Sequence, residues 1–272
     1  MQLVRQADPD RYLSVLYAPE AKRGALFALY AFNAEIARIR DVVSAPMPGE
    51  IRLQWWRDAI SSGTIEGAGG HPVASALLAA IAEHGLPGAA LQNCLDARVF
   101  DLYDDAMPGR TELEGYCGET ASALIQLAAM ILDPHAAPDF AALAGHAGCA
   151  QAIALLIRHM PLHRARGQCY VPPEILAAAG LTRDAFIAGE PASAMRAAVS
   201  AMAALAGEHH AAFLRGAARI PVSLRPAFLP LAPTAARLDR IEPDTAWTAP
   251  ATDISALRRQ WLFLRRAAKG WG

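Results

Sequence analysis

The residues with the clearest chemical potential lie in the segment QAIALLIRHMPLHRARGQCYVPPEIL, from Gln151 to Leu176. Five cationic or potentially cationic side chains gather there: Arg158, His159, His163, Arg164 and Arg166. Such a cluster can attract an anionic lipid head group, a phosphorylated ligand or an acidic protein surface. The alternative is a solvated basic turn with its arginines in water.

Two histidines four residues apart on one helix form a common pair of metal ligands. Here Pro161 separates His159 from His163. A proline disfavours helical geometry in the residue before it, so the helix is expected to end or kink between them. The two histidines should therefore not share a face, and we expect no metal site.

A second segment, YAFNAEIARIRDVVS from Tyr30 to Ser44, carries Asp41. At helical spacing Asp41 lies near the side of Tyr30 and Asn33, which predicts that it points inward. A buried carboxylate needs a charge partner, a metal or an altered pKa. The alternative is an aspartate at a helix end that faces water.

A separate acidic stretch, DARVFDLYDD, places Asp101, Asp104 and Asp105 on one side of a helix. Charge pairing between helices, or an acidic surface, accounts for them without a metal.

The segment 253–272 is predicted to form a basic amphipathic helix. One stripe holds Leu257, Trp261, Leu264 and Ala268, and its cations fall on two others: Arg258, Arg265 and Lys269, and Arg259 with Arg266. Such a helix can lie in the head-group layer of an anionic membrane, with its tryptophans at the interface. It can equally pack its apolar stripe on the core and leave its arginines in water. We expect Arg258, Arg259, Trp261, Arg265 and Arg266 to contact a membrane or a partner.

Helices must position all of these residues, because apolar side chains recur at helical spacing and no stretch alternates like a strand. The expected helices run over about 19–43, 49–62, 72–84, 89–103, 111–132, 138–160, 193–219, 224–238 and 253–268. The connections are short enough for one all-α bundle that spans residues 1–272.

Composition excludes some classes of function. With 272 residues, 54% hydrophobic residues and a net charge of -1, the chain can build a large core and has no basic excess for nucleic acid. The widely spaced Cys94, Cys117, Cys149 and Cys169 are expected to be reduced, buried thiols. No signal peptide is expected, nor any run of roughly 20 uninterrupted apolar residues. The expected protein is soluble or peripheral.

In its segment order the chain resembles the squalene/phytoene synthase family. The segments are DRYLSVLYAPEAKRGALFALYAF (10–32), LQWWRDAI (53–60), HPVASAL (71–77), ELEGYCGETASALIQL (112–127) and QCYVPPEIL (168–176). The resemblance implies a single isoprenoid-synthase-type bundle around a central cavity. In active members, two aspartate motifs hold magnesium ions that bind the substrate diphosphate.

By this resemblance the first motif aligns with Ala37 and Asp41, and the second with His159 and His163. Only one of four carboxylates remains, so we expect no catalytic residues and no cofactor. The implied vestigial diphosphate site consists of Asp41, Gln151, Arg158, His159, His163, Arg166 and Tyr170. Magnesium would be needed only if the chain still condensed farnesyl or geranylgeranyl diphosphate, which is the first alternative function.

One branch of the family has lost its aspartates in the same way: the assembly factors for respiratory complex I, NADH:ubiquinone oxidoreductase. The resemblance to that branch implies a non-catalytic role in complex I assembly, with complex I subunits or assembly intermediates as partners. The expected location is cytoplasmic or peripheral, on the inner face of the bacterial plasma membrane or the mitochondrial matrix side. A second alternative is a non-catalytic protein that binds an isoprenoid or an anionic lipid.

Overall fold

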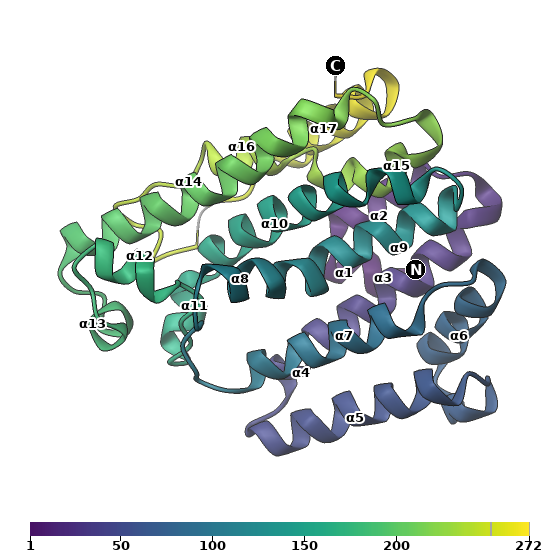
Figure 1. Cartoon of the computed structure of the whole chain (residues 1–272), viewed down its shortest axis with the longest axis horizontal. Coiled ribbons are helices and arrows are strands. Elements are labelled where there is room, and N and C mark those ends of the chain that lie inside the picture. The colour runs from purple at the N-terminus through teal and green to yellow at the C-terminus, as the bar shows by residue number, and fades with distance from the viewer. Residues whose placement is uncertain (251, 272) are drawn as a thin grey trace.

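The computed structural model describes residues 1–250 and 252–271, and these residues form helices and connecting turns without any β-strand (Figure 1). An isolated bridge between Ala106 and Cys169 is their one β-type pairing. The predicted all-α class is confirmed.

Among the described residues, the first half of the chain forms nine α-helices and one π-helical turn. They are α1 (Gln2–Ala7), α2 (Pro9–Leu16), α3 (Glu20–Ala37), α4 (Ile39–Val42), α5 (Pro46–Ser62), α6 (Pro72–His84), α7 (Gly88–Val99), α8 (Arg110–Cys117), the π turn (Gly118–Ser122) and α9 (Ala123–Leu132).

The second half begins with the long helix α10 and ends with α17. Its helices are α10 (Ala141–Arg158), α11 (Met160–Ala165), α12 (Pro173–Ala178), α13 (Arg183–Ala188), α14 (Ala192–Ala217), α15 (Arg225–Phe228), α16 (Thr234–Leu238) and α17 (Ala256–Lys269). Short 3₁₀ turns at 66–68, 100–102, 137–140, 222–224 and 229–231 connect several of them.

The long predicted helices are present, but three of them are broken. The predicted helix 224–238 divides into α15, a 3₁₀ turn and α16. The predicted helix 19–43 divides at Arg38 into α3 and α4, and the helix 138–160 ends at Arg158. The short helices α1, α2, α12 and α13 were not predicted. Each has six or eight residues, which is too short for a helical period to stand out in the sequence.

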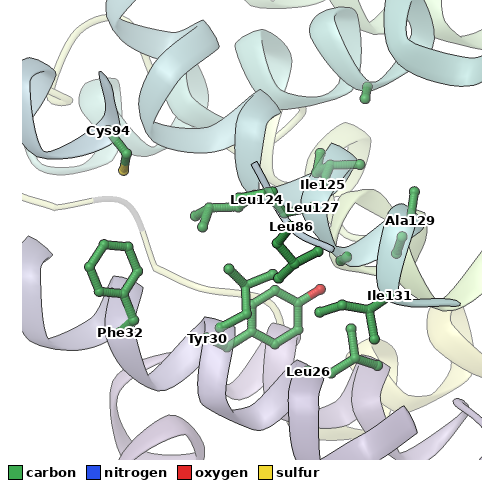
Figure 2. Packing of buried hydrophobic residues seen from close by; sticks show 14 of the residues in the cluster. Leu26, Tyr30, Phe32, Leu86, Cys94, Leu124, Ile125, Leu127, Ala129 and Ile131 are labelled. Atoms are coloured by element: carbon green, nitrogen blue, oxygen red, sulfur yellow. The ribbon is translucent and has the colours of Figure 1, made fainter. Parts of the chain in front are cut away.

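Helix α10 lies between α14 and the α8–α9 layer and contributes to two hydrophobic clusters (Figure 1). Its first half packs into a cluster with α3, α6 and α9, in which Tyr30 and Leu26 meet Leu124 and Ile131 (Figure 2). Its second half, through Ile153 and Ile157, packs into a cluster with α14. The four cysteines are buried and free, as predicted.

The π turn approaches α10 at Gly148. A Cβ atom at Gly148 would lie 2.4 Å from the backbone nitrogen of Ser122, so only glycine permits this contact. The Ser122 hydroxyl donates to the carbonyl oxygen of Gly145, at 2.9 Å. The approach brings α8 and the π turn against the centre of the molecule.

One helical stretch, Ala137–Arg158, is long and apolar enough to cross a membrane by length and composition. Polar residues such as His146 and Gln151 interrupt this stretch, so it is not the run of uninterrupted apolar residues whose absence the sequence predicted. Half of its most apolar window is buried inside the protein, as expected for a core helix.

Candidate functional site

The two segments singled out in the sequence meet at the ends of α4 and α11. Helix α10 ends at Arg158, His159 occupies the junction, and Pro161 lies in the first turn of α11. Proline is favoured there because its missing N–H would have no helical partner. The predicted interruption near Pro161 is confirmed, but it lies at His159 rather than between the two histidines. The N–H of His163 donates to the carbonyl oxygen of His159, at 2.9 Å, so the expectation that the two histidines share no face was wrong.

Asp41 does not point inward. Its side chain is 52% exposed and forms an ion pair with Arg166, at 2.8 Å. The inward prediction was wrong because the helix breaks at Arg38, so the spacing from Tyr30 and Asn33 no longer decides the direction of Asp41.

The two histidines lie close together but do not act as cations at neutral pH. Their rings are 6.1 Å apart, and the ring of His163 lies 4.6 Å from that of Tyr170. Burial, followed by the charge of Arg158, lowers the pKa of His159. Burial and the neighbouring His159 lower the pKa of His163 to about 4. The five-membered basic cluster of the sequence therefore reduces to three arginines.

Each of these arginines has a partner inside the protein. Arg164 donates to three backbone carbonyl oxygens, those of Phe186, Ile187 and Trp247, at 2.6–2.8 Å. Arg158 pairs with Asp253, at 2.9 Å, and Arg166 pairs with Asp41. The prediction of a basic cluster that attracts an anionic ligand or surface needs correcting, because these guanidinium groups bind the chain itself.

The polar centre beside His163 is built on Asp101, which is only 9% exposed. Its carboxylate accepts hydrogen bonds from the hydroxyls of Tyr170, at 2.6 Å, and Tyr116, at 2.8 Å. It also pairs with Arg98, at 3.0 Å. Burial and the negative charge of Asp101 raise the pKa of both tyrosines, which stay protonated as donors.

The sequence prediction that Asp101, Asp104 and Asp105 lie on one side of a helix was wrong. The helical conformation stops at Leu102, and Tyr103 is extended, so the two later aspartates are exposed. Sequence reasoning also missed Arg98 and Tyr116 as partners of Asp101. The spacing of three residues from Arg98 to Asp101 is the signal that was available.

Little space remains between these side chains. The hollow lined by His163, Tyr170, Met160 and Phe186 has a volume of about 10 Å³, room for roughly one water molecule. Ligand pockets usually measure roughly 300–1,000 Å³. The hollow beside Tyr170 is therefore far smaller than a ligand pocket.

Gln151 and Arg158 have their side-chain partners outside the predicted site. Gln151 donates to the carbonyl oxygen of Pro230, at 3.0 Å, and its own oxygen is 3.4 Å from a nitrogen of Arg11. Both contacts are structural and connect α10 to α2 and to the turn before α16.

Arg158 belongs to an ion network that joins the ends of the chain. Asp253 contacts Arg158, Arg237 and Arg259, at 2.8–3.0 Å. Asp10 of α2 pairs with Arg237 and, at 3.0 Å, with Arg259. This network, called the Asp253 network below, fixes α2, α10, α16 and α17 to one another.

The contact residues predicted on α17 divide between its two faces. Arg258, Trp261 and Arg265 are exposed, whereas Arg259 lies in the Asp253 network. Arg266 lies 5.9 Å from the ring of Trp271. The predicted membrane contact is therefore wrong for Arg259 and Arg266, because these arginines face the protein.

A magnesium site of the family type does not fit these residues. The positions aligned with the four aspartates hold Ala37, Asp41, His159 and His163, and the one carboxylate is paired with Arg166. Among residues 1–250 and 252–271, no group of three or more His, Cys, Asp or Glu side chains is placed to hold a metal ion.

Curated relatives of the chain fall into two groups. The NADH dehydrogenase (ubiquinone) complex I, assembly factor 6, of Bos taurus is 35% identical over 235 residues, covering 84% of this chain and 68% of the relative. The protein of the same name from Homo sapiens is 33% identical, with the same coverage. The presqualene diphosphate synthase of Sinorhizobium fredii is 28% identical over 175 residues, covering 63% of this chain and 61% of that enzyme.

Solved structures of prenyl synthases share the fold. A dehydrosqualene synthase in complex with ligand superimposes with a TM-score of 0.80 at 17% identity, covering 98% of this chain and 93% of the other. Squalene synthase HpnC from Alicyclobacillus acidocaldarius gives 0.71 at 20% identity, covering 88% and 89%. The predicted isoprenoid-synthase-type bundle is confirmed. The family model described as squalene/phytoene synthase matches residues 4–264, and with these relatives it shows that the chain belongs to the squalene/phytoene synthase family.

Proposed function

We propose that this chain is a non-catalytic member of the family that acts in the assembly of respiratory complex I. The observation that carries the proposal is the set of contacts at the aligned diphosphate site: Asp41 pairs with Arg166, and His163 packs against Tyr170 beside a hollow of about 10 Å³. The relatives that are 33–35% identical over 84% of the chain and carry the name of a complex I assembly factor support it.

Prenyl transfer is disfavoured for a chemical reason. Ionising an allylic diphosphate requires a cation cluster that neutralises the leaving group, and magnesium needs several carboxylate oxygens for that role. A hollow of about 10 Å³ also leaves no room there for a prenyl chain or an isoprenoid cargo.

We place its action at the inner membrane, on the cytoplasmic face in a bacterium or the matrix side in a mitochondrion. The partners that we propose are complex I subunits or assembly intermediates. The printed names of the relatives support a role in assembling this complex. The membrane side is part of the proposal.

Deletion and complementation in the source organism test the proposal. Deletion is expected to lower NADH:ubiquinone oxidoreductase activity and to leave partial complex on native gels. Complementation with Asp41→Asn should restore both, because Asp41 contributes only an exposed ion pair. Normal complex I after deletion would contradict the proposal.

A second assay tests the prenyltransferase alternative. Purified protein is incubated with farnesyl or geranylgeranyl diphosphate over a range of magnesium and manganese concentrations, and diphosphate release is measured. An active synthase of the family serves as the positive control. Release that Asp41→Ala abolishes would establish catalysis and overturn the non-catalytic assignment.

A further inference from the structure

Helix α17 is held to the protein by one face only. Phe263 is fully buried, 6.4 Å from the ring of Tyr17, and Arg259 is tied into the Asp253 network. Trp271, after the helix, packs edge-on against Phe213, at 5.5 Å. These contacts fix the rotation of α17, so the direction of its other face is set by the fold.

The opposite face carries the apolar stripe into solvent. Leu257 is 81% exposed, Trp261 62% and Leu264 53%, and the exposed Ala268 continues the line. The sequence alternative in which this stripe packs on the core is wrong. An exposed, contiguous apolar stripe with a tryptophan at its centre marks an interaction surface.

Cations border this stripe, and α17 itself carries no acids. Arg258, Arg265 and Lys269 are exposed along one flank, and the helix sequence ALRRQWLFLRRAAK contains no Asp or Glu. None of the three forms an ion pair with a residue that the structure describes. The face therefore combines apolar side chains with positive charge that no ion pair among the described residues neutralises. A surface that complements it has a negatively charged outer layer above an apolar one.

Helix α5 gives an internal comparison. Its exposed Met47 and Ile51 form a similar apolar line, at 71% and 63% exposure. However, Glu50 and Asp58 lie on the same helix, and Glu50 accepts from Tyr103. In Figure 1, α5 and α17 lie at opposite edges of the molecule. Only α17 has the charge for an anionic surface.

We propose that the outward face of α17, defined by Leu257, Arg258, Trp261, Leu264, Arg265 and Lys269, lies in the head-group layer of an anionic bilayer. The apolar stripe enters the acyl boundary while the basic flank contacts lipid phosphates. Because α17 is already folded and fixed, binding does not require ordering of the helix. This inference rests on the proposed function only for the presence of a membrane, and it names the attachment surface.

Vesicle co-sedimentation of the purified full chain tests the surface. Binding is expected to be at least tenfold stronger to phosphatidylcholine vesicles containing about one third phosphatidylglycerol than to phosphatidylcholine alone, since each cation near an anionic surface contributes. Arg258→Gln/Arg265→Gln should weaken it about tenfold or more. Trp261→Ser/Leu264→Ser should do so as well, because both apolar side chains leave the acyl boundary.

Matched variants provide the controls. Arg5→Gln/Arg52→Gln removes the same charge from exposed sites elsewhere, and Met47→Ser/Ile51→Ser removes a similar apolar area from α5. Both should bind like the unmodified chain. Circular dichroism and Tm measurements establish that all four variants are folded.

Three results would overturn the inference: equal binding to neutral vesicles, equal losses in the control pairs, or no loss in the α17 pairs. Self-association that Trp261→Ser/Leu264→Ser abolishes would assign the face to a second copy and overturn it too. Normal complex I in the deletion strain would contradict the proposed function but leave the vesicle result standing, so the two failures are distinguishable.

Discussion

Two groups of charged residues, one around Asp101 and one around Asp253, satisfy their carboxylates in different ways. Asp101 is almost fully buried and takes two phenol hydroxyls and one guanidinium. Asp253 is partly open to water and takes three guanidinium groups. Burying a charged group costs free energy, so two of the three partners of Asp101 are neutral hydroxyls. Solvent near Asp253 reduces this cost, so three guanidinium groups can surround it.

The comparison explains what became of the family's ligand site. The segment from Gln151 to Leu176 supplies Tyr170 to the first group and Arg158 to the second. Tyr170 donates a hydrogen bond to Asp101, and Arg158 forms an ion pair with Asp253. These two residues, which the family resemblance assigned to a ligand site, therefore stabilise the fold.

The largest effect is expected at Asp101. Asp101→Ala leaves Arg98 as a buried charge without its partner, which should lower the free energy of unfolding by about 3–5 kcal/mol. Urea denaturation measures the change, with the exposed Asp105→Ala as the control. Asp101→Leu/Arg98→Met, which removes both charges, should recover part of the loss. A loss at Asp101 no larger than at Asp105 would show that burial does not separate the two groups.

The next effect concerns pH and His163, which touches Tyr170 in the Asp101 group. Its pKa is lowered to about 4 from 6.5, so the unfolded chain binds a proton first as the pH falls. Stability is therefore lost between about pH 6.5 and 4 and stays level below, by about 3 kcal/mol in total. Urea denaturation of His163→Asn across this range should show a total loss of stability that is smaller by that amount, and so a shallower slope against pH. An unchanged slope would contradict the assignment.

A smaller effect is expected at Asp253, in the second group. Burial opposes ionisation, but the hydrogen bond and charge of Arg237 hold the pKa of Asp253 well below its usual 3.8. Asp253→Asn should cost about 2 kcal/mol at neutral pH. Because the stabilisation is present above pH 3.8 and lost as the pH falls below it, the difference from the unmodified chain should shrink in strong acid. A difference that grows in acid would reverse this interpretation.

The smallest effect is expected for the exposed pair of Asp41 and Arg166. Surface ion pairs contribute at most about 1 kcal/mol, so Asp41→Asn should change the free energy of unfolding by less than that, and salt should reduce it further. Chemical denaturation at low and high salt checks this. A loss of unfolding free energy as large as that of Asp253→Asn would show that the pair of Asp41 and Arg166 stabilises the fold as much as the Asp253 network does.

The sequence predicted features that depend on local rules. The all-α class, the helix interruption near Pro161 and the four buried cysteines follow from periodicity, proline geometry and composition. It failed where a short break resets the direction of later side chains. The interruption at Arg38 turned Asp41 outward, and the end of helical structure at Leu102 separated Asp101 from Asp104.

Pairings over long sequence distances were also beyond local reasoning. In the sequence, Arg158 and Arg259 are cations next to apolar helix residues. Nothing near either of them indicates that both contact Asp253. The helical period of α17 separated its stripes correctly. Which stripe faces the protein depends on distant partners, among them Asp10 and Asp253 for Arg259 and Tyr17 for Phe263.

The contact between Asp10 and Arg237 has a consequence for synthesis. The two residues are 227 positions apart. At about 5–20 residues per second, the carboxylate of Asp10 leaves the ribosome roughly 10–45 s before its first guanidinium partner. During that interval α2 has no ionic reason to dock, and water solvates its acid at no cost. Helix α2 therefore completes its ionic contacts only after most of the residues that follow it have been made.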